Sequence, residues 1–364
     1  MSPPYPAPPR PETAPKGRGS ATNPSGRFEP WTREGFDDGW GSADEPLPPL
    51  RTTVTPDASR TIIARNQSPD IPFDQSINPY RGCEHGCVYC YARPSHGYLG
   101  LSSGLDFETR LFAKPDAARL LDAELRREGY RVQPIALGTN TDPYQPIERE
   151  RRITRAILET LVAFRHPFTI VTKSALVVRD LDLLAPMAAA GMVRVHLSVT
   201  TLDRGLARRL EPRAATPSRR LDAIRALAQA GVPTGVMVAP VILGLNDPEV
   251  EAILEAAAAA GAASAGYLLL RLPHEIKDLF QEWLDAHAPL RKERVLSLIR
   301  DSRGGRLNDP NFGSRHTGQG KHAELVAERF KLAARRLSLD RNGWKLDTSQ
   351  FRPPPRPGDQ LSLL

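Results

Sequence analysis

The segment QSINPYRGCEHGCVYC, residues 75–90, joins a short strand-like run to three cysteines within eight residues. These are Cys83, Cys87 and Cys90, and the 364-residue chain contains no other cysteine. Three thiolates this close in sequence reach one metal centre only where the backbone loops around it. Gly82 and Gly86 supply the conformational freedom that such a loop needs. The segment therefore predicts a metal site directly after a strand.

Thiolate ligands favour zinc or an iron–sulfur centre. A structural zinc site needs a fourth protein ligand, and His85 is the only near candidate. A [4Fe–4S] cluster held by three cysteines instead leaves one iron open for chemistry. We favour the cluster because the sequence has no second pair of cysteines to complete a zinc knuckle.

Outward from this segment, short β-rich runs alternate with amphipathic helical runs. The predicted strands are 75–80, 134–138, 168–172, 193–200, 234–241 and 265–270, and the predicted helices are 116–128, 148–164, 178–190, 218–230 and 247–260. Strands separated by helices of this length indicate right-handed βαβ units and a mostly parallel sheet. Six units are fewer than the eight of a complete barrel, so the alternation predicts an α/β fold without establishing closure.

Both ends of the chain differ from this pattern. Residues 1–60 contain 13 of the 35 prolines, and we predict a disordered Pro-rich tail over 1–65, in which Trp31, Phe36 and Trp40 form a stretch able to dock. The α/β core then covers 66–272. A helical C-terminal extension over 273–348, with helices at 274–302 and 321–337, and a flexible tail over 349–364 complete the predicted organisation.

Composition excludes several classes of protein. No run of eighteen apolar residues is present, which argues against a membrane helix, and the N-terminus lacks the apolar stretch of a secretory signal. Three clustered cysteines are not a secreted disulfide framework and indicate the reducing cytoplasm. The net charge of +7 is unevenly distributed, with 7 Lys and Arg against 3 Asp and Glu in residues 203–225. Such clustering makes a nucleic acid or another anion a candidate substrate.

The CxxxCxxC spacing, with the aromatic Tyr89 before the last cysteine, resembles the cluster loop of radical S-adenosylmethionine (SAM) enzymes. The resemblance implies a [4Fe–4S] cluster on Cys83, Cys87 and Cys90, whose open iron binds the amino and carboxylate groups of SAM. It also implies reductive cleavage of SAM to a 5′-deoxyadenosyl radical, supplied with an electron by a donor such as flavodoxin or ferredoxin. The expected fold is a partial (β/α)6 TIM-type barrel, which agrees with the six units.

Later motifs are similar to the spore photoproduct lyase-like branch of this superfamily, including its uncharacterised bacterial members. The motif LGTNTDPYQPIE, residues 137–148, follows the second strand, and the later matches lie at the ends of the third, fourth and fifth strands. The resemblance makes six residues candidates for binding SAM: Thr139, Asn140 and Thr141 near its amino group, Lys173 at its carboxylate, Ser198 near its ribose and Ile242 against its adenine.

Tyr89 and Tyr91 flank Cys90 and match tyrosines that the branch associates with radical relay or SAM packing, so they are the candidate catalytic residues. Photoproduct lyases use a further cysteine as hydrogen donor, and this chain has none outside the cluster motif. Repair of a thymine dimer by the same route is therefore not expected.

Within the Gly/Asn/Pro-rich loop 303–320, residues 304–316 resemble the same bacterial members, and we expect Arg306, Arg315 and His316 to face the substrate. The alternative is that this loop only caps the open side of the barrel. The predicted function is a radical SAM enzyme acting on an unknown substrate, with nucleic acid a candidate and no membrane partner. The alternative is a zinc- or iron–sulfur-containing module that binds nucleic acid or protein without SAM chemistry.

Overall fold

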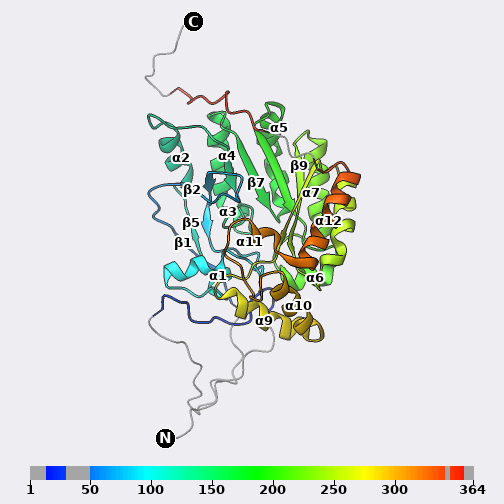
Figure 1. Cartoon of the computed structure of the whole chain (residues 1–364). Helices are drawn as coiled ribbons and strands as arrows, with labels where there is room; N and C mark the ends of the chain where they lie inside the picture. The colour runs from blue at the N-terminus through cyan, green and yellow to red at the C-terminus, as the bar shows by residue number, and fades with distance from the viewer. Residues whose placement is uncertain (1–13, 30–49, 341–344, 356–364) are drawn as a thin grey trace.

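A computed structural model describes residues 14–29, 50–340 and 345–355 of the chain. Its centre is a seven-stranded sheet in the order β10-β9-β8-β7-β6-β3-β2 (Figure 1). The strands are β2 (Ile63–Arg65), β3 (Gln75–Ile77), β6 (Ile135–Leu137), β7 (Phe168–Thr172), β8 (Val193–Ser198), β9 (Thr234–Val241) and β10 (Ser264–Leu269). All adjacent pairs are parallel except β2 with β3.

Five helices connect the six parallel strands and cover one face of the sheet, as the alternation predicted (Figure 1). They are α2 (Ala117–Leu125), α4 (Ile153–Ala163), α5 (Leu181–Ala189), α7 (Pro217–Gln229) and α8 (Val250–Ala259). Within the described residues β10 and β3 are not hydrogen-bonded to each other, so the architecture is a partial (β/α)6 barrel. The predicted α/β fold class is confirmed.

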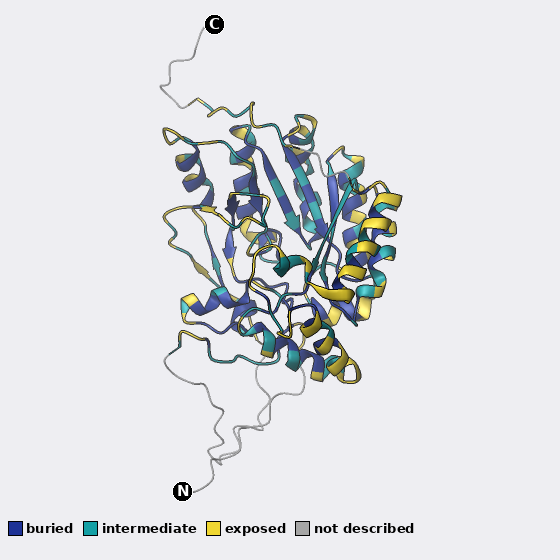
Figure 2. Cartoon of the chain, viewed as in Figure 1, coloured by how far each residue is buried: buried dark blue, intermediate teal, exposed yellow. Residues whose placement is uncertain are grey.

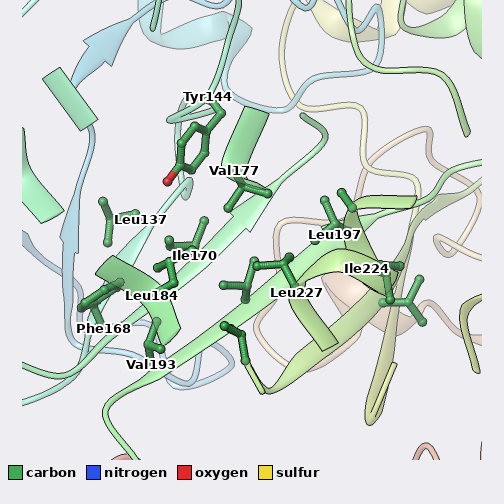
Figure 3. Packing of buried hydrophobic residues seen from close by; sticks show 14 of the residues in the cluster. Leu137, Tyr144, Phe168, Ile170, Val177, Leu184, Val193, Leu197, Ile224 and Leu227 are labelled. Atoms are coloured by element: carbon green, nitrogen blue, oxygen red, sulfur yellow. The ribbon is translucent and has the colours of Figure 1, made fainter. Parts of the chain in front are cut away.

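The two faces of the sheet differ in burial. In β7, Phe168 and Ile170 are fully buried under the helices, whereas Thr169 and Val171 on the other face are half-buried (Figure 2). Figure 3 shows the apolar layer between sheet and helices, which includes Phe168, Ile170, Val193, Leu197, Leu184 and Leu227. Each such side chain contributes about 1.5–3 kcal/mol by leaving water. The apolar layer holds the strands in place, and the less buried face lines the inside of the partial barrel.

The prediction of a disordered tail over 1–65 is wrong for residues 14–29 and 50–65. β1 (Thr53–Pro56) joins β5 (Arg110–Ala113) and β4 (Tyr80–Arg81) in a second, three-stranded sheet, and β2 lies in the main sheet. Polar contacts hold residues 14–29: the backbone amides of Gly19 and Ser20 each donate to the carboxylate of Glu108 at 3.0 Å. Amino-acid composition cannot predict that this segment is ordered, because the contact joins residues about 90 positions apart in the sequence. Trp31, Phe36 and Trp40 lie outside the described residues.

The C-terminal extension is helical as predicted, with α9 (Ile276–His287), α10 (Lys292–Asp301), α11 (Ser314–Thr317) and α12 (Gly320–Arg336). Figure 1 shows α9 and α10 at the edge where the parallel strands end, and α12 packs against α8 and β10. The flexible tail predicted from 349 is wrong for residues 349–355, because Phe351 packs on Tyr130 and Phe164 with ring centroids 5.7 and 6.2 Å apart. Among the helices described, none has the length and apolar character needed to cross a membrane.

Candidate active site

The three cysteines lie on a loop that follows β4 at the edge where the parallel strands end. Backbone contacts hold this loop from two sides: the N–H of Cys83 donates to the carbonyl of Phe107 at 2.9 Å, and the N–H of Val88 donates to that of Leu210 at 3.1 Å. Gln145 adds a third contact, because its side chain accepts from the N–H of Glu84 at 2.9 Å and donates to the carbonyl of Gly82 at 3.1 Å. The loop is therefore tied to α1 (Asp106–Thr109), to α6 (Arg204–Leu210) and to the segment after β6.

Gly82 and Gly86 are required by this loop in the way that the sequence predicted. Their φ angles are +77° and +68°, in the left-handed region that only glycine adopts easily. A Cβ atom on Gly82 would also lie 2.6 Å from Leu111 and 2.9 Å from the carbonyl of Phe107, so the position has no room for a side chain.

A fully buried ion pair supports the cysteine loop. The guanidinium of Arg93 contacts the carboxylate of Glu108, and neither side chain is exposed. The same guanidinium donates from Nε to the carbonyl of Cys87 at 2.8 Å. Glu108 also accepts the backbone amides of Gly19 and Ser20, so one carboxylate joins residues 14–29 to the cysteine loop.

The chemistry of the donor set fits an iron–sulfur cluster. Cys83 and Cys87 are buried, Cys90 is half-buried, and all three thiols are free of disulfides. Burial raises the pKa of all three thiols, and the positive charge of Lys173 opposes this on Cys87 and Cys90. Bound iron would supply the positive charge that buried thiolates require. The described residues contain no group of three or more His, Cys, Asp or Glu arranged around a single metal ion, whereas each thiolate of a cluster bonds its own iron.

The predicted SAM residues that follow β6 are organised around the side-chain amide of Asn78. This amide donates to the hydroxyl of Thr139 at 3.2 Å and accepts the backbone N–H groups of Asn140 and Thr141 at 2.9 and 3.3 Å. Thr141 is buried and its hydroxyl donates to the carbonyl of Tyr80, whereas Thr139 is half-buried and Asn140 is exposed. The segment thus has a fixed backbone with two accessible polar side chains.

Lys173 lies at the end of β7, directed at the cysteine loop. Its ammonium is 5.8 Å from the centroid of the Tyr89 ring. Asp142 fixes the backbone here, accepting the N–H of Lys173 at 2.7 Å and the hydroxyl of Thr172 at 2.6 Å. Its carboxylate also lies 3.3 Å from the imidazole of His85 in the cysteine loop. Burial alone would raise the pKa of Asp142, but the charge of His85 and these hydrogen bonds lower it to about 2.

Tyr89 is buried, and its hydroxyl donates to the carboxylate of Glu211. The guanidinium of Arg220 pairs with the same carboxylate, and Thr200 donates to it at 2.5 Å. Burial opposes ionisation, yet the charges of Arg220 and Lys173 lower the pKa of Glu211 to about 2. A buried carboxylate thus holds the phenol beside the cysteines.

Ser198 and Ile242 lie at the ends of β8 and β9. Ser198 is buried, and its carbonyl accepts from Arg220 at 2.9 Å. Ile242 is fully buried in an apolar cluster that includes Cys87 and Val88. The side chain of Asn246 shapes this turn by accepting the N–H of Ile242 at 2.6 Å and donating to the carbonyl of Thr200 at 2.6 Å.

The second predicted tyrosine, Tyr91, is half-exposed and donates its hydroxyl to the carbonyl of Thr139, so it connects the cysteine loop to the predicted SAM segment. Of the residues expected to face the substrate, Arg306 is exposed to solvent. Arg315 and His316 are half-buried on α11, which contacts β10, and both lie against Asp70.

Residues 77–257 match the Radical SAM superfamily. The chain belongs to this superfamily. Its members cleave SAM reductively with a [4Fe–4S] cluster, so the protein is a radical SAM enzyme whose cofactors are that cluster and SAM. Membership does not favour the alternative of a binding module without SAM chemistry.

The chain is similar to uncharacterized proteins from distant organisms. An uncharacterized protein of Mycobacterium tuberculosis (strain H37Rv) is 40% identical over 232 residues, which is 63% of this chain and 68% of the relative. Another, from Methanocaldococcus jannaschii, is 30% identical over 176 residues, covering 48% of this chain and 62% of the relative.

Among solved structures, a mutant of spore photoproduct lyase superposes with a TM-score of 0.55 at 16% identity, covering 78% of this chain and 79% of that one. A second mutant of this lyase, solved with bound AdoMet and dinucleoside spore photoproduct, gives a TM-score of 0.54 at 16% identity. At this identity the likeness concerns the fold, and it supports the radical SAM architecture.

Sequence reasoning missed the buried charges around the loop. Glu108, Glu211 and Arg220 are typical surface residues by type, and their partners are distant in sequence. The sequence did indicate a functional role for Asp142, because it lies inside the motif 137–148, directly after a strand. Arg271 also had a signal, because it follows β10 at the same edge of the sheet, where α/β proteins build their sites.

Proposed function

We propose that Cys83, Cys87 and Cys90 hold the cluster and that SAM lies between the cysteine loop and the ends of β6 to β9. When bound, the two cofactors supply a 5′-deoxyadenosyl radical that abstracts hydrogen from a substrate. The residues proposed to bind SAM are Thr139, Asn140, Thr141, Lys173, Ser198 and Ile242.

The observation that carries this proposal is the position of Lys173. It is a cation at the end of a parallel strand, its charge acts on the thiols of Cys87 and Cys90, and its ammonium has no carboxylate within ion-pair distance in the described part of the chain. A ligand carboxylate next to the cluster would complete this charge. The amino acid end of SAM has that chemistry.

We propose that Tyr89 and Tyr91 act at this site in different ways. The hydroxyl of Tyr89 is held by Glu211, a proton acceptor in hydrogen-bond contact, which suits a residue that gives up a hydrogen atom. Tyr91 is half-exposed beside Thr139, which suits a residue that packs on SAM or substrate.

Two partners complete the proposal. A one-electron donor such as flavodoxin or ferredoxin reduces the cluster in the cytoplasm. Nucleic acid is the candidate substrate that the basic surface supports, since Arg204, Arg208 and Arg209 are exposed on α6, whose last residue contacts the cysteine loop. Its test is whether binding of single- or double-stranded DNA or RNA weakens with salt and with the double variant Arg208→Ala/Arg209→Ala.

The test of SAM cleavage is anaerobic turnover with dithionite, with 5′-deoxyadenosine measured by mass spectrometry. We expect about four iron and four sulfide per chain and 5′-deoxyadenosine from the wild type, and neither a stable cluster nor product from Cys87→Ala. Lys173→Met keeps its iron but needs a higher SAM concentration, while Lys173→Arg recovers part of the binding. One zinc per chain with no SAM binding contradicts the proposal.

A further inference from the structure

A cluster of basic side chains lies where the partial barrel is incomplete, between β10 at one end of the sheet and the β2–β3 connection at the other. α11 contacts β10, and Figure 1 shows it in front of the strands. Arg315 of α11 forms a two-pronged ion pair with Asp70 of the β2–β3 connection, donating from Nε at 2.6 Å. Arg303 connects α11 to the end of β10, because it donates to the carbonyls of Leu270 and Arg315 at 2.8 and 2.9 Å. This contact therefore bridges the open side of the barrel.

Arg271 lies inside this bridge without a partner. It follows Leu269, the last residue of β10, and forms no ion pair within the described residues. Its Nε is buried and has no hydrogen-bond acceptor among those residues. Burying an unpaired polar group costs roughly 1–3 kcal/mol, and more when the group is charged. A bound anion supplies the acceptor that this buried Nε lacks.

His316 has the same property. Both ring nitrogens are buried and lack a hydrogen-bond partner in the described part of the chain, although Nε2 lies 3.5 Å from Asp70. Burial and the charge of Arg271 lower the pKa of His316, which shows that imidazole and guanidinium share one environment.

The charges of this cluster do not balance. Three guanidinium groups, those of Arg271, Arg303 and Arg315, face two carboxylates, those of Asp70 and Asp309. The carboxylate of Asp309 is already occupied by the hydroxyl of Ser314 at 2.5 Å. The excess charge is therefore positive, and its unpaired donors point to an anion.

We propose that Arg271, assisted by Arg315 and His316, binds a phosphate or carboxylate group of the substrate. This inference rests on the proposed function, since it assumes that the substrate is held at the strand ends beside SAM. The planar fork of a guanidinium matches both groups with two parallel hydrogen bonds. The charge of Arg271 also acts on the phenol of Tyr91, the residue after Cys90.

The experiment measures anion binding by the reconstituted full-length protein, saturated with SAM so that the SAM carboxylate is already in its own site. The probes are radiolabelled inorganic phosphate and acetate in equilibrium dialysis. We expect one of them to bind and to bind at least tenfold more weakly to Arg271→Ala, with partial recovery in Arg271→Lys. The matched control is Arg335→Ala, which removes an exposed arginine from α12 and leaves binding unchanged. The tighter of the two probes identifies the group.

Three outcomes overturn the inference: neither anion binds, Arg335→Ala weakens binding as much as Arg271→Ala does, or anion binding rises when SAM is left out. Circular dichroism of each variant separates loss of the site from loss of the fold. Wild-type protein that forms 5′-deoxyadenosine but binds neither anion refutes the inference alone. Protein that binds phosphate or acetate but forms no 5′-deoxyadenosine refutes the proposed function alone.

Discussion

Replacement of Glu108 by glutamine tests the claim that one buried carboxylate holds the N-terminal segment and the cysteine loop together. The carboxylate is fully buried and accepts from Gly19, Ser20 and Arg93. Glutamine keeps the shape but removes the charge and replaces one acceptor oxygen by a donor. The guanidinium of Arg93 is then left buried without its counter-charge.

The expected magnitude follows from the burial of both partners. Breaking a buried ion pair by removing one partner costs about 3–5 kcal/mol, compared with about 0–1 kcal/mol for an exposed pair. At about 1.4 kcal/mol per factor of ten, local opening becomes roughly a hundred- to a few thousand-fold more frequent. We therefore expect the amides of residues 14–29 to exchange faster by that factor. Iron content falls as well, because Arg93 also donates to the carbonyl of Cys87.

Hydrogen exchange followed by mass spectrometry gives the exchange rates, and iron analysis of the reconstituted protein gives the cluster content. The matched control is Asp222→Asn, which breaks the exposed pair of Asp222 with Arg225 and leaves residues 14–29 unchanged. Exchange in Glu108→Gln within threefold of wild type, with full iron content, would refute the reasoning.

Three further predictions concern single residues. Gly82→Ala lowers iron content, since its Cβ meets Leu111 and a backbone carbonyl, whereas Gly304→Ala, also at positive φ but with nothing within 4 Å, keeps its iron. Tyr91→Phe loses the contact with Thr139 and raises the SAM concentration for half-maximal 5′-deoxyadenosine formation severalfold at unchanged iron content; an unchanged SAM requirement contradicts the proposed role. Burial lowers the pKa of His166 from 6.5 to about 4. The neutral imidazole therefore contributes about 3 kcal/mol to the free energy of unfolding above pH 6.5, and this contribution is lost as pH falls to 4. Proteolysis of residues 345–355, where Phe351 packs on His166, should accelerate over that range in wild type and not in His166→Leu.

The sequence predicted those parts of the molecule whose signal is local. Each parallel strand and its following helix has its own hydrophobic period, so all six units were found, with ends that differ by a few residues. The cysteine spacing is equally local, and it is the basis for the proposed cluster loop. Residues 14–29 and 50–65 were missed because they are held by contacts with Glu108 and by strand pairing, neither of which leaves a period in the sequence.

The candidate site shows the same division. Lys173 was predicted as a SAM-binding residue because it ends a strand and matches a motif, and it remains a proposal. Glu211 and Arg220 were not predicted, because by residue type they are ordinary surface charges. Their contact with Tyr89 forms only in the fold, since they lie 122 and 131 residues after it in the sequence. The pairing of Arg315 with Asp70 is likewise invisible in the sequence, because it joins positions 245 residues apart across the open side of the barrel. The expectation that Arg315 faces the substrate did not include its ion pair with Asp70.

Buried polar pairs fix the cysteine loop without using the side chains of its cysteines. Each of three pairs ties the loop to a different element: Arg93 with Glu108 of α1, His85 with Asp142 after β6, and Tyr89 with Glu211 after α6. None of these contacts uses a cysteine sulfur, so the loop is oriented while all three proposed cluster ligands remain available. Such pairs add little net stability compared with apolar packing, but a missing partner is costly, and they therefore specify one arrangement. Because the other two pairs do not involve Glu108, its loss should release one side of the loop and residues 14–29 while the parallel sheet stays folded.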